Sequence, residues 1–423
     1  MDLKVGIEQV KIRLLELWNY RIFKFAVIIH LSYFIISLIL IGFKADFQVF
    51  YKSGEIFITN ISDLYNKANY SVDKNLWFRY FPLCAIFFIP YSLLIFEVAY
   101  IFFNIVNFFL NIFICLILYK IILLIQSEDH EKDEKRIITY LSLFLIGFPQ
   151  ISNYFIGQIN LYIVFLILLS LFILLKYEEL KWQLLGSFLV GISIMIKPIA
   201  IFLIPFSIAI YYDLKKRKLY FDLKKSLIRI IGMLIPIFLN LIMFFIYPSL
   251  LAGFLETNFS GAENVIVNFS FSITRLITNF FNFYSIPYNQ IILFIGVVIV
   301  IGSIGLLIYI FRSDKQYSII YGYLLGICIM LLVYFDSWDH HLLIITPLLI
   351  VVLFNLPRDS EIANKTIIPG FIALNFLNLI FIGVWALTES FFPYNFVSTI
   401  FLLLILYGIG IYSLKNDIKI QEN

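Results

Sequence analysis

The sequence is poor in charged residues. Only 14% of its 423 residues are Asp, Glu, Lys or Arg, whereas 62% are hydrophobic and 19% are aromatic. A typical soluble domain is about one quarter charged, and burying this much apolar surface needs a core larger than a domain of about 250–300 residues can form. The composition therefore excludes a soluble enzyme, a disordered chain and a nucleic-acid binder, and it predicts an all-α polytopic membrane protein.

Cysteine and net charge are also scarce. Cys84, Cys115 and Cys328 lie in apolar runs, without the spacing of disulfide pairs or metal ligands. We interpret them as small apolar residues of the interior. The net charge of +4 is too small to indicate a polyanionic partner, and the basic residues gather in a few loops, where they indicate topology.

The common catalytic motifs are absent as well. The chain has no phosphate-binding Gly-rich loop, no nucleophile elbow and no His-Glu-x-x-His sequence, which argues against the enzyme classes that depend on them. Transporters with duplicated halves typically show an internal repeat, and this sequence shows none.

Long apolar runs make up most of the chain. A span needs about 20 apolar residues, and cytoplasmic loops are enriched in Lys and Arg. The basic stretch 213–229 is the clearest inside marker, and it places 44–80 and 248–289 outside as two large loops. The pattern predicts about 12 transmembrane helices, although one of the apolar pieces between 81 and 212 must fail to cross if the sidedness is to hold.

The chain divides into an arm and one large domain. Residues 1–21 interleave apolar and basic side chains, which is typical of an amphipathic helix on the cytoplasmic surface of a membrane. Residues 22–423 are expected to form a single integral-membrane domain. We expect a multi-pass protein of the plasma membrane.

A carboxylate stands directly after the first predicted span. Asp46 begins the first outer loop, next to Lys44. A carboxylate held at the lipid boundary is positioned like a general base, because partial burial raises its pKa. The alternative interpretation is an ordinary solvated Asp at the membrane interface.

Two amides and an ammonium interrupt later apolar runs. Gln158 and Asn160 follow Gly157, and amides in hydrocarbon either join helices or line a polar cavity. Lys197 precedes Pro198, and a proline here commonly marks a broken helix beside a cavity. An intramembrane lysine is costly and usually functional; the alternative is that Lys197 snorkels to the interface.

The outer loops contribute further polar candidates. Arg79 and Tyr80 lie where the first loop returns to the membrane. An arginine there can clamp a phosphate or anchor the helix to lipid head groups, and Tyr80 fits an interfacial aromatic belt. Arg275 lies in the second outer loop, which could cover a cleft as a lid.

The densest polar cluster is the segment 336–341, which reads Asp-Ser-Trp-Asp-His-His. Adjacent helical side chains point about 100° apart, so His340 and His341 cannot easily ligate one metal ion. Three interpretations stay open for Trp338, His340 and His341: a contact to phosphate or sugar, a solvated loop, or a His-Asp metal site.

In chain order, these elements resemble the GT-C superfamily of membrane glycosyltransferases that use polyprenyl-phosphate sugars. The greatest similarity is to glycosyltransferase family 87, which includes mannosyltransferases. The similarity covers most of residues 22–350. The matching pieces are Asp46-Phe47 with Tyr51, Leu64-Tyr65, Tyr80-x-Pro82, Gly157-Gln158-x-Asn160, Gly186 to Lys197-Pro198, and Ser337-Trp338-x-His340-His341 followed by Pro347.

The resemblance implies a GT-C fold that moves a sugar, expected to be mannose, from a polyprenyl- or dolichyl-phosphate donor to a lipid or glycan acceptor at the outer face, with inversion. Asp46 is then the general base. Membrane lipids are the other expected partners, no nucleic acid or cofactor is expected, and a divalent cation is left open. The candidates for holding the donor phosphate and sugar are Lys197, His340, His341, Arg79, Arg275, Tyr80, Gln158, Asn160 and Trp338.

The competing interpretation is a transporter or flippase for a lipid-linked saccharide. Such a protein would also carry amides, histidines and an intramembrane lysine such as Lys197. It would need neither a carboxylate next to the first span nor long outer loops. A purely structural membrane subunit is disfavoured by the cost of burying Lys197.

Overall fold

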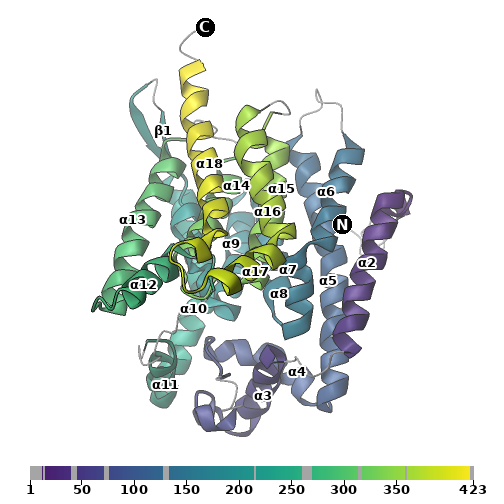
Figure 1. The fold of residues 1–423 in the computed structure, drawn as a ribbon, viewed down its shortest axis with the longest axis vertical. Helices are drawn as coiled ribbons and strands as arrows, with labels where there is room; N and C mark the ends of the chain where they lie inside the picture. Colours follow the sequence, from purple (N-terminus) through teal and green to yellow (C-terminus); the bar gives the residue numbers. More distant parts are fainter. Residues whose placement is uncertain are drawn as a thin grey trace.

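The protein is almost entirely helical in its computed structural model (Figure 1). The expected arm 1–21 lies mostly outside the described residues. Those residues are 12, 15–39, 45–70, 76–126, 133–213, 216–259, 269–312, 317–357 and 360–419.

Four described helices are long and apolar enough to cross a membrane. They are α2 (Arg21–Ile39), α5 (Phe96–Ile125), α10 (Leu223–Ile246) and α13 (Gln290–Ile310). The stretch Ala363–Phe376 and the helix α17 (Asn378–Thr388) meet at 74° and would make a fifth span if counted as one. An all-α membrane protein is confirmed, but the expected count of about 12 spans is not.

The shortfall arises because several apolar pieces do not form single long helices. Residues 82–92 form a 3₁₀ helix, η5 (Pro82–Phe88), and one turn of α-helix, α4 (Ile89–Ser92). A 3₁₀ helix rises about 2 Å per residue, so neither piece can span about 30 Å of hydrocarbon.

Prolines also interrupt helix formation around residue 200. The expected apolar piece 199–212 forms η6 (Pro198–Leu203), η7 (Pro205–Ser207) and the short strand β1 (Ile210–Asp213). The piece 137–155 is divided into α6 (Glu134–Ile146) and α7 (Phe148–Ile156), because Gly147 is extended and Pro149 occupies the first turn of α7. Proline removes a backbone donor and favours helix starts, so these breaks lie where the sequence requires them.

The core is built around two helices that are buried on all sides. Every residue from Ile319 to Val333 of α14 (Ser318–Val333) is buried, as is every residue from Leu342 to Phe354 of α15 (Leu342–Asn355). On α14, a Cβ at Gly326 would lie 2.9 Å from the Phe202 carbonyl oxygen. Glycine therefore allows η6 to pack directly against α14.

The two ends of the molecule differ in character (Figure 1). One end carries the last turns of α18 (Thr399–Lys419) and the hairpin of β1 with β2 (Lys218–Phe221), in which Tyr211 pairs with Tyr220. The other end carries α3 (Ala45–Thr59), α4 and α11 (Pro248–Phe259). The described parts of the two stretches that charge assigns to opposite faces, 213–229 and 44–80, thus lie at opposite ends.

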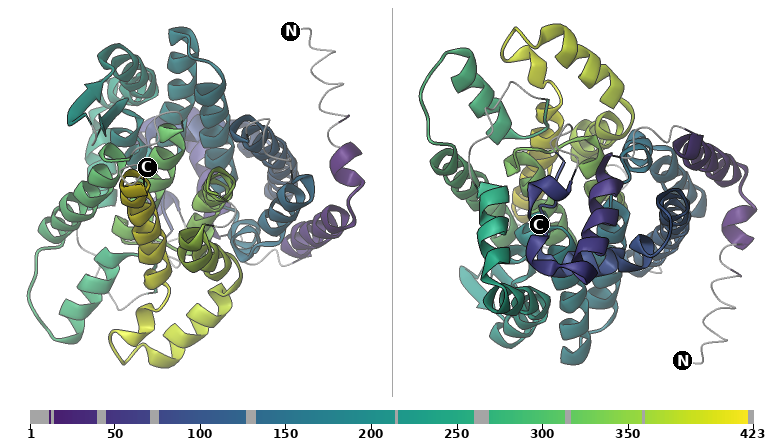
Figure 2. Two further views of the ribbon diagram at one scale, coloured as in Figure 1. Left: turned by 90° about the horizontal axis from the view of Figure 1, so that it is seen from above. Right: turned by 90° about the horizontal axis from the view of Figure 1, so that it is seen from below.

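The remaining helices complete a bundle in which α2 lies at the rim (Figure 2). They are η2 (Ile61–Asp63), η3 (Lys67–Asn69), α8 (Asn160–Lys176), α9 (Leu180–Ile196), α12 (Ile273–Phe283), η8 (Asp339–His341), the π-helix η9 (Ala363–Ile367), α16 (Ile368–Phe376), η10 (Tyr394–Phe396) and α18 (Thr399–Lys419).

Candidate functional site

Asp46 lies in the first turn of α3, where the positive end of the helix dipole favours a carboxylate. Its Oδ2 accepts a hydrogen bond of 2.6 Å from Nε2 of Gln158. Burial raises the pKa of Asp46, while the bond from Gln158 and the charges of Lys197 and Arg79 act in the opposite direction. The carboxylate therefore has the character of a base whose proton affinity is increased by its surroundings.

The contact between Asp46 and Gln158 depends on Gly157. Gly157 ends α7 in the left-handed conformation, with φ +68°, and glycine adopts this conformation without strain. A Cβ at this position would lie 2.7 Å from the Cβ of Phe47. Glycine thus provides both the turn and the close approach that bring the end of α7 against the start of α3.

Asn160 is the centre of the polar cluster. Its Nδ2 donates to the carbonyl oxygen of His340 at 3.0 Å and to Oδ1 of Asn153 at 3.2 Å. Its Oδ1 accepts from Nζ of Lys197 at 2.6 Å. One buried amide therefore connects the starts of α8 and η8 with the break between α9 and η6.

Lys197 lies at that break in an extended conformation, which the following Pro198 favours. The side chain is 4% exposed, which argues against snorkelling to the interface. An ammonium can donate three hydrogen bonds, and among the described residues Asn160 supplies its one side-chain acceptor. The remaining capacity suits an anionic ligand such as a phosphate.

The rings of His340 and His341 lie 4.2 Å apart, centroid to centroid, and both residues are buried. Burial and the charge of Lys197 hold the pKa of both imidazoles well below 6.5. The backbone N–H of Trp338 donates to Nδ1 of His341 at 3.1 Å, and a hydrogen bond between the same ring and the backbone of Asp336 acts against the lowering of its pKa. The two histidines offer hydrogen bonds rather than charge.

The aromatic candidates flank these groups. The ring of Trp338 lies 5.9 Å from that of His340, and the side chain of Trp338 is 39% exposed. The ring of Tyr80 packs 5.2 Å from that of Phe50, on the same helix as Asp46. Among the described residues, no group of three or more His, Cys, Asp or Glu could hold a metal ion.

The two candidate arginines occupy different places. Arg79 stacks on Trp77, with its guanidinium 4.9 Å from the ring centroid, and its charge reaches Asp46. Arg275 forms an ion pair of 2.7 Å with Asp336. The carboxylate of Asp336 neutralises the charge of Arg275. Arg275 therefore holds the segment 336–341, and no bond in the described part of the chain joins it to the cluster around Asn160.

Sequence reasoning missed Asn378 at the start of α17. Its Nδ2 donates to Oδ1 of Asp339 at 3.1 Å, and the residue is fully buried. Burial raises the pKa of Asp339 to about 6. The signal was present, because Asn378 interrupts an apolar run as Gln158 does.

The comparison with known protein families gives a match that includes part of the candidate site. A family model described as Glycosyltransferase family 87 matches residues 77–334, which is more than half of the chain. The matched segment contains Arg79, Gln158, Asn160 and Lys197. No curated protein matches the chain.

Proposed function

The chain belongs to glycosyltransferase family 87, and from this premise we propose that it transfers a sugar, mannose, from a polyprenyl-phosphate donor to a lipid or glycan acceptor. Family membership itself makes the protein a membrane glycosyltransferase. The sugar, the donor, the acceptor and the side of the membrane are our proposal. We assign the reaction to the extracytoplasmic face of the plasma membrane, because the hairpin of β1 and β2, next to the basic residues, lies at the opposite end from α3, which carries Asp46.

The proposed reaction is a single displacement. The acceptor hydroxyl oxygen forms a bond to the anomeric carbon while the bond from that carbon to the phosphate oxygen breaks, which inverts the configuration. The hydroxyl proton passes to Asp46, through the oxygen that Gln158 leaves free. The polyprenyl phosphate departs as an anion and needs no proton, so one base is sufficient.

Lys197 is the proposed partner of the departing phosphate. Charge-assisted bonds inside a dry site stabilise a developing anion more than they would in water. The charge of Arg79 acts on Asp46, and the neutral imidazole of His341 is proposed to add one hydrogen bond. Trp338 and Tyr80 are proposed to contact the sugar ring.

A single observation carries this proposal: two short sets of hydrogen-bonded polar residues place a base near a buried cation. Asp46 is bonded to Gln158, two residues before Asn160, and Asn160 is bonded to both Lys197 and His340. A base and a phosphate-binding cation placed in this way fit group transfer from a lipid phosphate. The family favours this function over the alternative of a transporter or flippase for a lipid-linked saccharide.

The test is a transfer assay with purified protein in lipid nanodiscs. Labelled polyprenyl-phosphate mannose and dolichyl-phosphate mannose are incubated with an envelope lipid extract, with and without Mg²⁺ or Mn²⁺. We expect label in a new product and release of the polyprenyl phosphate. Movement of intact donor across the bilayer, with no product, would support the flippase instead.

A further inference from the structure

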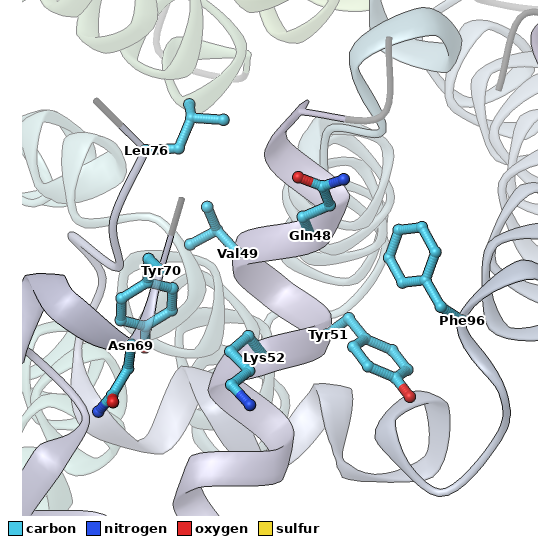
Figure 3. Close-up of a pocket in the computed structure, with 8 residues that line it drawn as sticks. All are labelled: Gln48, Val49, Tyr51, Lys52, Asn69, Tyr70, Leu76 and Phe96. Carbon is cyan, nitrogen blue, oxygen red and sulfur yellow. The ribbon is translucent and has the colours of Figure 1, made fainter. Parts of the chain in front are cut away.

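A cavity opens beside α3 on the side that faces away from the polar cluster. Its volume is about 240 Å³, and α3 supplies half of its lining. The lining residues are Gln48, Val49, Tyr51, Lys52, Asn69, Tyr70, Leu76 and Phe96 (Figure 3). Drug-sized ligands occupy pockets of about 300–1,000 Å³, so this one suits a single small polar unit.

The aromatic walls of the cavity are fixed in place. The hydroxyl of Tyr51 donates to the Leu94 carbonyl oxygen at 2.8 Å, and that of Tyr70 donates to the Leu64 carbonyl oxygen at 2.7 Å. The rings of Tyr51 and Phe96 meet edge to face, 5.2 Å apart. Because the hydroxyls of Tyr51 and Tyr70 are already bonded within the protein, the two tyrosines and Phe96 offer the cavity a rigid apolar surface.

One charged side chain lines the cavity, and its charge is compensated by a neighbour outside the lining. Lys52 is matched by Glu55, with Nζ 2.9 Å and 3.0 Å from the two carboxylate oxygens. No described residue pairs with the Gln48 amide, and Asn69 uses only its Nδ2, in a bond to the Asp63 carbonyl oxygen. Neutral amides and a compensated ion pair beside aromatic rings suit hydroxyl groups and C–H faces better than an anion.

The cavity and Asp46 lie on different sides of one helix. At about 100° per residue, Gln48 is turned about 200° from Asp46. A helix with its side chains is about 10–12 Å across, so a ligand that reaches both places must pass around the first turn of α3. A single sugar ring is too short to do so.

We propose that this cavity binds a neutral sugar unit of the acceptor glycan, remote from the hydroxyl that reacts at Asp46. The inference rests on the proposed glycosyl transfer and sharpens it, because the acceptor must then contain at least two sugar units. The distal unit sits against Tyr51 and Phe96, with its hydroxyls bonded to Gln48 and Asn69.

Binding can be tested without catalysis. The native thiols Cys84, Cys115 and Cys328 are buried, so a Gln48→Cys variant presents one accessible thiol inside the cavity. Mannotriose at millimolar concentration should slow maleimide labelling of that thiol several-fold in nanodiscs. The matched control is Thr59→Cys, at the exposed far end of α3, where the sugar should have no effect.

A second measurement concerns acceptor length. Gln48→Leu and Asn69→Leu should each raise the KM for an oligosaccharide acceptor about tenfold, the loss of roughly one hydrogen bond. Donor affinity and the KM for a simple alkyl mannoside should stay unchanged, as should all constants of Thr59→Ala. Nanodiscs are needed because alkyl glycoside detergents would compete for the cavity.

The outcomes separate this inference from the proposed function. Protection at position 48 without any sugar transfer would keep the binding site and overturn the enzyme proposal. Transfer with equal labelling rates in the presence and absence of mannotriose would overturn the acceptor site. Equal protection at positions 48 and 59 would show a non-specific effect and would also overturn it.

Discussion

A buried cation lies at each end of α9, and the two are held in different ways. Gln183, in the first turn of the helix, accepts a bond of 2.9 Å from Nε of Arg229, whose second guanidinium bond of 3.1 Å goes to the Ser207 carbonyl oxygen. Lys197, at the other end, donates to Asn160 alone among the described side chains. The two ends are about 21 Å apart along the helix.

The difference separates an internal support from a binding group. Arg229 connects α9, α10 and the end of η7 through a planar fork of donors, which suits a fixed geometry. Lys197 lies at the break between α9 and η6, and its ammonium keeps N–H groups that are not bonded to described side chains, near the carboxylate of Asp46. Burial alone therefore does not mark a functional cation; the unused hydrogen-bonding capacity and the neighbouring carboxylate do.

The largest effect is expected from removing the base next to the Lys197 end. Asp46→Asn should lower turnover by about 10²-fold or more, while folding and donor affinity stay nearly intact, because the amide can still accept from Gln158. In the wild type, the rate should fall as pH drops through the raised pKa of Asp46. Single-turnover transfer over a pH series measures both, and activity within a few-fold of wild type would move the base to Asp336 or Asp339.

Lys197→Met tests the binding end directly. The phosphate loses a charge-assisted partner worth roughly 1.5–3 kcal/mol, so the Kd for a non-transferable polyprenyl-phosphate sugar should rise about 10- to 100-fold. The Tm should hold or rise slightly, because the change removes a buried charge, although it leaves Asn160 Oδ1 without its donor. Unchanged affinity would make Lys197 a second structural cation and end the comparison.

Arg229→Met should give the reverse pattern. The Gln183 oxygen and the Ser207 carbonyl lose their donors, at about 1–3 kcal/mol for each buried group left unpaired, so the Tm should fall. Donor affinity and turnover should match the wild type once the protein is folded. Weakened donor binding at a temperature well below the Tm would contradict the division of roles.

The smallest effect extends the comparison to an anion. The pKa of Asp339 is raised from 3.8 to about 6 by burial. Between these two pH values, the folded state therefore holds a proton that the unfolded state has released. Stability should therefore fall as pH rises from about 4 to about 6 and then level off. Asp339→Asn should flatten this slope and raise stability at neutral pH, by on the order of 1–2 kcal/mol. Melting curves across this pH range would refute the burial of Asp339 if the two proteins ran in parallel.

Composition was sufficient to predict the membrane class but not the helices within it. Hydropathy marks 82–92 and 198–207 as apolar, yet their prolines favour 3₁₀ turns that cannot cross a bilayer. It also cannot separate α14, buried throughout, from α13, whose apolar side chains are largely exposed. The two helices have similarly high hydropathy, so a hydropathy average over the sequence does not distinguish them.

The candidate site was predicted where polar residues interrupt apolar runs. Asp46, Gln158, Asn160, Lys197 and His340 are such residues, and the structure brings them together. The cavity beside α3 gave no such signal, because Gln48 and Lys52 alternate with apolar residues as on any solvated helix face. Only the return of the chain at Asn69 and Tyr70 makes that face concave.

The complete burial of α14 and α15 has a consequence for how the chain is inserted during synthesis. At 16 and 14 residues, they extend about 24 and 21 Å, less than the hydrocarbon thickness of about 30 Å. Neither helix can rest alone in lipid without thinning the bilayer around it. Both pack against α8, and α15 also packs against α5; both of these helices leave the ribosome earlier. We therefore expect the first half of the chain to be inserted before the last third packs into the membrane.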